Sequence, residues 1–177
     1  MKKVIALCGS QSARSANLQL IHEMQKIAES KFILELFDKL DQLPHFNPDL
    51  DTESPPALVS VFRNELKNAD GVLICTPEYA MGVPGTLKNA IDWLVSSMEL
   101  SHKPVALITA STSGEKAHYA LLATLNVIEA DVNDDTALLV PFIKTKLSST
   151  GSISDKKLHS DITLLLAALS EKINQGK

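Results

Sequence analysis

The sequence predicts an α/β fold in which helices cover both faces of a parallel β-sheet. The main observation is that apolar runs of strand length alternate five times with amphipathic helical stretches, without internal repeats or low-complexity tracts. Neighbouring parallel strands need a right-handed, helix-length return between them, so this alternation is typical of a parallel sheet. The length of 177 residues and the 45% hydrophobic composition suffice for one core. We therefore expect a single domain over residues 1–177.

The middle of the chain contains the clearest strand, loop and helix. Residues 72–75 form a continuous apolar run between turn signals, which indicates a strand buried on both faces of the sheet. From Pro84 onward the apolar residues recur at helical spacing, at positions 87, 91, 94, 95 and 98. Residues 76–83 are therefore expected to be a loop at the carboxyl end of a central strand, the place where open α/β sheets bind ligands.

The chain begins with a similar unit. Residues 4–8 are an apolar run that predicts the first strand, and residues 9–13 are expected to be a loop. Ser15 is a candidate N-cap for a helix whose apolar residues are at positions 18, 21, 24, 27 and 28.

The next segment predicts a strand and a long loop. Residues 31–37 alternate apolar and polar side chains, which favours a partly exposed strand near a sheet edge. Residues 38–56 carry four prolines and four aspartates, so we expect a long surface loop, and such loops often bind ligands. A helix then begins after Pro56, with apolar residues at positions 58, 59, 62 and 66.

The remainder of the chain predicts two more strands and two more helices. Residues 104–109 are the fourth strand, 110–114 its loop and 117–129 a helix. After a polar break, residues 137–143 are expected to form a fifth strand, in which Pro141 favours an edge position. A last helix has Ser152 or Ser154 as its candidate cap and apolar residues at positions 158, 162, 165, 166, 169 and 173.

Five strands permit the sheet order 2-1-3-4-5. In such sheets ligands bind where the strand order reverses, here between the first and third strands. The loops after those two strands, residues 9–17 and 76–83, also have the most distinctive polar patterns in the chain. Sequence pattern and topology therefore point to one site.

Composition excludes several classes of function. A net charge of −4, without clustered Lys and Arg, argues against a nucleic-acid partner. No apolar stretch reaches the roughly 18 to 20 residues of a membrane span, and the amino terminus is interpreted as a strand rather than a signal peptide. Two cysteines without a secretory signal fit a reducing compartment, so we expect a cytoplasmic protein. The five histidines show no metal-ligand spacing, and no Gly-x-Ser-x-Gly elbow suggests a serine hydrolase.

The loop at residues 9–17 has the chemistry of a phosphate site. Free backbone N–H groups, three hydroxyls and the Asn17 amide are available to a phosphate dianion, and the dipole of the following helix favours its charge; the hydroxyls belong to Ser10, Ser12 and Ser15. The loop is neither a mononucleotide P-loop nor a dinucleotide fingerprint, because it lacks Gly-Lys-Ser/Thr and contains one glycine. The alternative is a serine-rich helix cap without a ligand.

The central unit resembles a known family. The runs TPEY at residues 76–79 and PGTLKNAIDW at 84–93 are similar to the signature of the NAD(P)H-dependent FMN reductases, a branch of the flavodoxin-like fold. About a dozen positions match at fixed spacing. The resemblance implies a three-layer flavodoxin-like sandwich with the 2-1-3-4-5 sheet, binding FMN at its carboxyl edge.

The resemblance also assigns the contacts with FMN. The family's phosphate loop is usually Gly-Ser-x-Arg-x-x-Ser-x-Asn; here Ser12 stands at the arginine position and Arg14 follows two residues later. Either Arg14 supplies the charge from a different angle, or the hydroxyls hold the phosphate alone. For the flavin ring the resemblance implies main-chain contacts in one loop and further contacts in a third loop. The implied residues are Ser10, Ser12, Arg14, Ser15, Asn17, Pro77, Glu78, Tyr79, Ala80, Ser111, Ser113 and Gly114.

Other conspicuous residues are interpreted structurally. Lys88 and Asp92 stand four apart on a helix and are expected to form an exposed ion pair. Trp93 borders the apolar stripe and is expected to pack in the core rather than stack on a ligand. Cys8 and Cys75 end neighbouring strands, and buried structural thiols are the simpler interpretation than a role beside the flavin.

The function implied is that of an FMN-dependent oxidoreductase with NADPH or NADH as co-substrate. It would pass two electrons by a ping-pong mechanism to a small-molecule acceptor, a quinone, azo compound, metal oxyanion or free flavin, and no side chain is expected to be catalytic. The resemblance further implies a homodimer or homotetramer with the long 38–56 loop near the site. Two alternatives remain at this point, a flavodoxin-type electron carrier and a flavin-free binding or regulatory module on the same fold.

Overall fold

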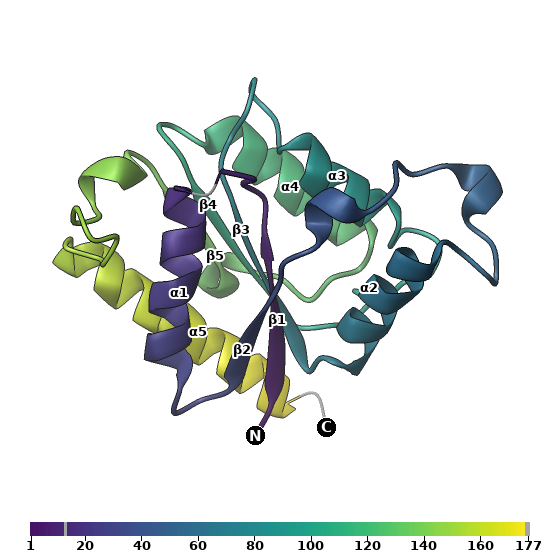
Figure 1. The fold of residues 1–177 in the computed structure, drawn as a ribbon. Coiled ribbons are helices and arrows are strands. Elements are labelled where there is room, and N and C mark those ends of the chain that lie inside the picture. Colours follow the sequence, from purple (N-terminus) through teal and green to yellow (C-terminus); the bar gives the residue numbers. More distant parts are fainter. Residues whose placement is uncertain (13, 176–177) are drawn as a thin grey trace.

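The computed structural model describes residues 1–12 and 14–175, and it contains one parallel sheet of five strands (Figure 1). The strand order is β2-β1-β3-β4-β5, so the predicted order 2-1-3-4-5 is confirmed. All four strand pairs are parallel. The strands are β1 Lys3–Cys8, β2 Ile33–Phe37, β3 Gly71–Thr76, β4 Val105–Ala110 and β5 Ala137–Val140.

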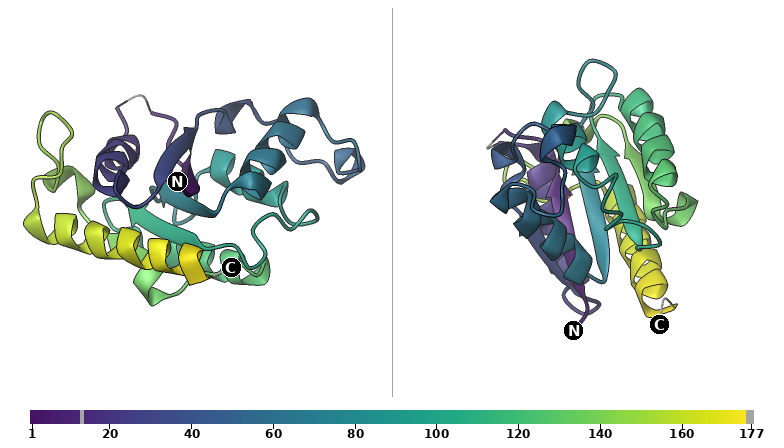
Figure 2. Two further views of the ribbon diagram at one scale, coloured as in Figure 1. Left: turned by 90° about the horizontal axis from the view of Figure 1, so that it is seen from below. Right: turned by 90° about the vertical axis from the view of Figure 1, so that its right-hand side faces the viewer.

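Helices pack on both faces of the sheet, which makes three layers (Figures 1 and 2). One core cluster joins α1 and α5 to the sheet, and a second joins α2, α3 and α4 to the opposite face. Apolar residues of the three central strands, β1, β3 and β4, point alternately into the two clusters, because successive side chains of a strand face opposite sides. The helices are α1 Ala16–Ala28, α2 Ala57–Asn68, α3 Gly85–Asp92, α4 Glu115–Val127 and α5 Lys156–Gln175.

The first and third strands end side by side in the middle of the sheet. Cys8 of β1 is in register with Cys75 of β3, and the Gly9 N–H donates to the Cys75 carbonyl at 2.9 Å. A Cβ atom on Gly9 would lie 2.2 Å from Thr76 Oγ1, so only glycine allows this approach. The loops that follow β1 and β3 therefore start together at one edge of the sheet.

The long segment 38–56 is less superficial than expected. It contains two short 3₁₀ turns, Leu40–Gln42 and Pro48–Leu50, and it buries the side chains of Leu40 and Leu43. Asp51 binds the Arg63 guanidinium at 2.7 Å, which ties the segment to α2. The prediction of a surface loop was wrong for these anchored residues, because the two leucines complete the core beneath α2 and α3.

The helix that begins after Pro84 is shorter than its apolar stripe suggested. The α3 helix ends at Asp92, and Val95 and Met98 are exposed rather than packed on the sheet. The carbonyl of Trp93 accepts hydrogen bonds from the Arg63 guanidinium. A Trp93 carbonyl that is bound to Arg63 is less available to a backbone N–H of a further helical turn. Trp93 itself is fully buried, and its indole N–H donates to the Pro44 carbonyl at 2.8 Å, as expected for a packing residue.

Two predicted boundaries near the carboxyl terminus were also wrong. The β5 strand stops at Val140 instead of residue 143, because Pro141 has no N–H for the ladder and Phe142 adopts a left-handed conformation with φ 54°. The α5 helix is capped by Asp155, whose carboxylate accepts from the Leu158 N–H at 2.7 Å, and by neither Ser152 nor Ser154. The edge positions of β2 and β5 agree with the prediction.

Within residues 1–12 and 14–175, no helix combines the length with the apolar character that crossing a bilayer requires.

Candidate functional site

A pocket of about 500 Å³ lies at the carboxyl edge of the sheet. The loops after β1, β3, β4 and β5 line it, and it therefore occupies the point where the strand order reverses. Among the predicted contact residues, those that line the pocket are Ser10, Ser12, Arg14, Ser15, Asn17, Pro77, Glu78, Tyr79 and Ser111. Ala16, Ala110 and Thr112 also line it, and they lie within the predicted loops although they were not named as contacts. Sequence reasoning missed the turn after β5, which contributes Phe142, Ile143, Lys144 and Thr145.

The first wall of the pocket is the amino-terminal end of α1. The Ser15 hydroxyl caps this helix by accepting from the Asn17 N–H at 3.2 Å and the Leu18 N–H at 3.4 Å. Ser10 and Ser12 stand in the loop before the cap and face the same pocket. Hydroxyls and the positive end of a helix dipole together favour an anion at this wall.

Asn17 braces this wall instead of offering a free amide. Its side-chain NH₂ donates to the Ala110 carbonyl at 3.1 Å, and its side-chain oxygen accepts from the Cys75 thiol at 3.3 Å. The residue is 3% exposed. Asn17 thus connects the start of α1 to the ends of β3 and β4, and its contacts hold the anion-favouring wall in place.

The second wall is the loop after β3. The Glu78 carboxylate accepts from the Ala117 N–H at 3.0 Å, in the first turn of α4. Tyr79 pairs with Gly82 through two backbone hydrogen bonds of 2.8 and 2.9 Å, which closes a tight turn with Ala80 and Met81 at its tip. The Tyr79 hydroxyl lies 3.5 Å from the Ser10 hydroxyl, so the two walls meet across the pocket mouth.

The third wall combines the loops after β4 and β5. The Phe142 N–H donates to the Thr112 carbonyl and the Ile143 N–H donates to the Ser111 carbonyl, each at 3.1 Å. These bonds hold Phe142 in its left-handed conformation, which costs on the order of 1 to 2 kcal/mol for a residue other than glycine. The turn brings Phe142 and Lys144 to the pocket. The signal in the sequence was Pro141, which ends the strand before these residues.

Three predicted contact residues lie outside the pocket. Ala80 is at the tip of the 79–82 turn, where its φ is 48°, and it does not line the cavity. Ser113 and Gly114 follow the lining residues Ser111 and Thr112, and Gly114 adopts φ 95° as the N-cap of α4. Side chains rarely tolerate this φ, and a Cβ on Gly114 would also lie 3.0 Å from a methyl of Leu139, so the turn favours glycine.

The charges around the pocket are unevenly distributed. The cationic residues among its described lining are Arg14 and Lys144, and Glu78 is the acidic one. The Glu78 carboxylate already accepts the Ala117 N–H. The end of the pocket beside α1 therefore suits an anionic group, and the end beside Pro77 and Tyr79 suits a flat, partly apolar one.

The buried titratable groups near the site serve the framework. Burial raises the pKa of the Cys8 thiol, and it raises the pKa of the Cys75 thiol well above its usual value, so neither is a thiolate near neutral pH. Burial lowers the pKa of His118, whose Nδ1 lies 2.9 Å from the Thr109 hydroxyl. The structural interpretation of the two thiols agrees with these surroundings. Lys88 and Asp92 form the expected ion pair on the outside of α3.

Comparison of the sequence with known proteins gives a consistent result. The sequence profile of the family described as NADPH-dependent FMN reductase matches residues 2–144. A quinone reductase of Escherichia coli is 32% identical over 182 residues, which cover 99% of this chain and 97% of that protein. An NAD(P)H-dependent FMN reductase of Pseudomonas aeruginosa is 30% identical over 172 residues, covering 94% of this chain and 92% of that protein.

Comparison of structures agrees. The flavoenzyme NAD(P)H:(acceptor) oxidoreductase FerB from Paracoccus denitrificans superposes with a TM-score of 0.86 at 27% identity, covering 99% of this chain and 98% of that one. The likeness therefore extends over nearly the whole length of both chains. Family profile, relatives and fold lead to one conclusion: this chain is an oxidoreductase of the flavodoxin-like fold and belongs to the NADPH-dependent FMN reductase family.

Proposed function

We propose that this protein binds FMN in the 500 Å³ pocket and uses it to pass two electrons from NADPH or NADH to a small-molecule acceptor. The observation that carries the proposal is the convergence of the loops after β1 and β3 on one pocket. One loop has hydroxyls and a helix amino terminus, and the other has the TPEY run that characterises the family.

The residues of the pocket fit FMN at both ends. The phosphate would lie against the start of α1, where Ser10, Ser12 and Ser15 present hydroxyls. The ring would lie against Pro77, Glu78 and Tyr79 on one side. Ala80, Ser113 and Gly114 remain predicted contacts through the backbone of these loops, although they do not line the cavity.

Bound FMN would supply the two-electron chemistry, and the chain would supply orientation and electrostatics. The hydrogen bond from the Ala117 N–H to the Glu78 carboxylate attaches the loop segment 77–79 to the first turn of α4. The backbone hydrogen bonds from Phe142 and Ile143 likewise attach the loop segment 111–112 to the turn after β5. Rigid backbone loops of this kind are suited to stabilise developing charge with N–H donors, without a side chain acting as acid or base.

We propose a quinone as the class of acceptor, because the E. coli relative, which aligns with this chain over 97% of its length, is a quinone reductase. Azo compounds, metal oxyanions and free flavin are the other acceptors to be compared. The pocket is open at the Tyr79 side, where the tyrosine is 53% exposed, and this leaves room for nicotinamide or acceptor to approach in turn.

Assembly and location are also part of the proposal. A homodimer or homotetramer is supported by large apolar side chains exposed on and after α3 and α4, at Val95, Met98, Tyr119 and Val127. Two free cysteines support a reducing, cytoplasmic environment. One domain over residues 1–177 is supported by the single sheet that both core clusters share.

Titration of the purified apo-protein with FMN, followed by flavin fluorescence, tests the binding step. Saturable binding at one FMN per chain is expected, and no binding would overturn the proposal together with a flavodoxin-type carrier. NADPH and NADH oxidation with a soluble quinone then tests the reaction. Parallel double-reciprocal lines are expected for a ping-pong enzyme, whereas FMN binding without turnover would favour the carrier.

A further inference from the structure

We propose that Lys144, at the turn after β5, binds the phosphate of FMN and supplies positive charge that the phosphate loop lacks at Ser12. The inference rests on the proposed function, because it assigns a further residue to the same pocket. Lys144 lies outside residues 9–17, where the sequence placed the whole phosphate site. Lys144 is 130 positions after Arg14 in the sequence. It lies between β5 and α5, and the fold brings it to the same pocket.

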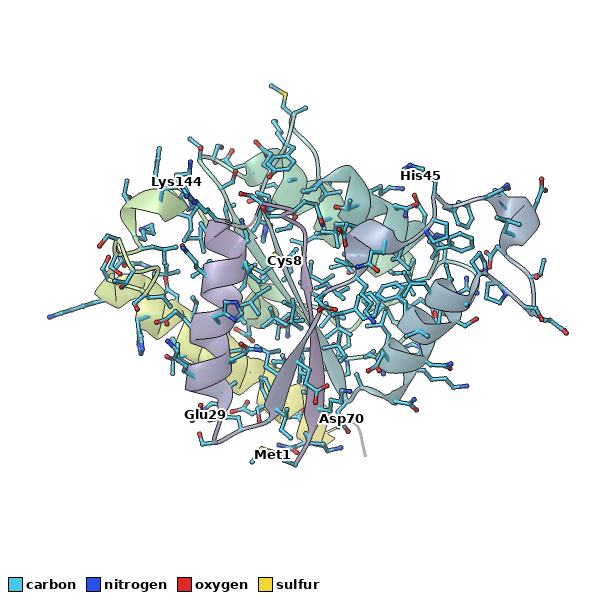
Figure 3. The ribbon with its side chains drawn as sticks, viewed as in Figure 1. Met1, Cys8, Glu29, His45, Asp70 and Lys144 are labelled. Atoms are coloured by element: carbon cyan, nitrogen blue, oxygen red, sulfur yellow. The ribbon has the colours of Figure 1, made fainter. Side chains whose placement is uncertain are left out.

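The first support is position. Lys144 lines the same pocket as Arg14, Ser15 and Ala16, which form the entry to α1. In Figure 3 the labelled Lys144 lies beside the amino-terminal end of α1, at the level of the loops and above Cys8. The phosphate of the proposed ligand belongs at this end of the pocket, because the helix dipole and the hydroxyls are there.

The second support is that the turn carrying Lys144 is anchored. Backbone hydrogen bonds from Phe142 and Ile143 attach it to the loop after β4, and the Thr145 hydroxyl donates to the Phe142 carbonyl at 2.9 Å. Phe142 is held at φ 54° by these contacts. Strained backbone that its surroundings maintain is frequent at binding sites. The anchoring keeps the base of the Lys144 side chain at the pocket.

The third support is that the Lys144 ammonium has no competing partner among the residues that the structure describes. It makes no ion pair or side-chain hydrogen bond with residues 1–12 or 14–175. Lys146, two residues later, lies 3.5 Å from Asp155, and Lys157 binds Asp161. Among these three lysines, Lys144 is the one that lines the pocket beside α1, and within the described part of the chain its charge is unpaired.

Charge balance explains why a second cation is useful. A phosphate monoester carries about −1.5 to −2 charges at pH 7. Arg14 offers one positive charge, and the serine hydroxyls offer none. Lys144 would bring the positive charge close to that of the phosphate, and the partly enclosed site would make the attraction stronger than in open solvent.

The test compares FMN with riboflavin, which has the same ring and no phosphate. K144Q is expected to weaken FMN binding about tenfold and to leave the Kd of riboflavin unchanged. K144R keeps the charge and is expected to restore most of the FMN affinity. K156Q is the matched control, because Lys156 is exposed at the start of α5 and does not line the pocket; it should leave both constants unchanged.

Each contrary result has a separate meaning. If the unsubstituted protein binds FMN and K144Q binds it equally well, the role of Lys144 is disproved and the proposed function stands. An equal loss of FMN and riboflavin affinity would indicate a structural role for Lys144 and would also disprove it. If K144Q keeps FMN affinity but raises KM for NADPH and not for NADH, the lysine binds the ribose phosphate of NADPH instead. Failure of the unsubstituted protein to bind FMN would disprove both proposals.

Discussion

The carboxylate of Glu78 and the backbone N–H of Ala117 are joined by a hydrogen bond of 3.0 Å across 39 positions of sequence. The bond crosses from the loop after β3 to the first turn of α4. A carboxylate is favoured at this place because the free N–H groups and the dipole of a helix amino terminus both attract it. Glu78 therefore acts as a remote cap, and the same contact determines where the Pro77–Tyr79 strip lies.

We expect E78A to lower the free energy of unfolding by about 1 kcal/mol, as for the loss of a helix cap. This corresponds to a decrease in Tm of about 2–4 °C for a chain of this size. FMN affinity should fall as well, because the strip that borders the pocket loses its attachment. E78Q retains an acceptor oxygen and should lose less on both measures. A larger loss in E78Q than in E78A would contradict the capping role.

The tip of the 79–82 turn is a place where stability can be gained. Ala80 and Met81 have φ values of 48° and 63°, and two central residues with positive φ define the turn that favours Asn followed by Gly. We expect A80N to raise Tm by about 1–3 °C, since asparagine tolerates this conformation better than alanine. A80V should lower Tm, because a branched side chain fits it worst. Thermal unfolding followed by circular dichroism measures both changes. Equal Tm values for the three proteins, or an A80V protein more stable than A80N, would refute the assignment.

The pairing of Asp51 predicts a loss of stability in acid. A hydrogen bond from the Ser96 hydroxyl and the Arg63 guanidinium lower the pKa of Asp51, against a smaller opposing effect of burial. The folded state therefore gains stability from this carboxylate above the unfolded pKa of about 3.9. That gain is lost as the pH falls below it through the folded value.

D51N should remove this dependence. Urea unfolding between pH 6 and pH 2 is expected to show a steeper loss in the unsubstituted protein than in D51N, which should be less stable at pH 6 by about 1–3 kcal/mol. D49N is a control, because Asp49 lies in the same segment without an ion pair among the described residues. Parallel pH profiles for the unsubstituted protein and D51N would rule out the pairing as a source of stability.

His118 predicts a second pH effect at a higher range. Its burial lowers the pKa, so the folded state favours the neutral ring. The contribution of His118 to the free energy of unfolding should be fully present above the ordinary pKa of 6.5. It should be lost as the pH falls from 6.5 through the lowered pKa of the folded state, because protonation of the ring then favours unfolding. H118N places an amide near the Thr109 hydroxyl and should flatten the profile between pH 7 and pH 5. Titration of the ring by NMR would show a pKa at or above 6.5 if this explanation is incorrect.

Much of the fold could be predicted because strand and helix patterns are local. The apolar run at 72–75 and the alternation at 31–37 depend on residues a few positions apart, and both became the expected strands. The wrong boundaries depended on distant partners. The carbonyl of Trp93 is taken by Arg63, 30 residues earlier, and no periodicity within 84–98 contains that information.

The same distinction applies to the site. The residues of loops 9–17 and 76–79 were identified because each loop carries its own motif directly after a strand. Phe142 was missed because the fifth strand was expected to continue to residue 143, and Lys144 was missed because it carries no motif of its own. Only the bonds of Phe142 and Ile143 to the loop after β4 bring this turn to the pocket.

The sequence by itself determined the class of fold and indicated the family, since alternating periods and a contiguous motif are sufficient for these. It permitted the strand order, which the family resemblance implied and the sheet confirmed. Tertiary structure alone decided which charges face the pocket. The reason is physical: a side chain reaches the site from any strand whose carboxyl end lies at the same edge, and that neighbourhood exists only after the sheet has assembled.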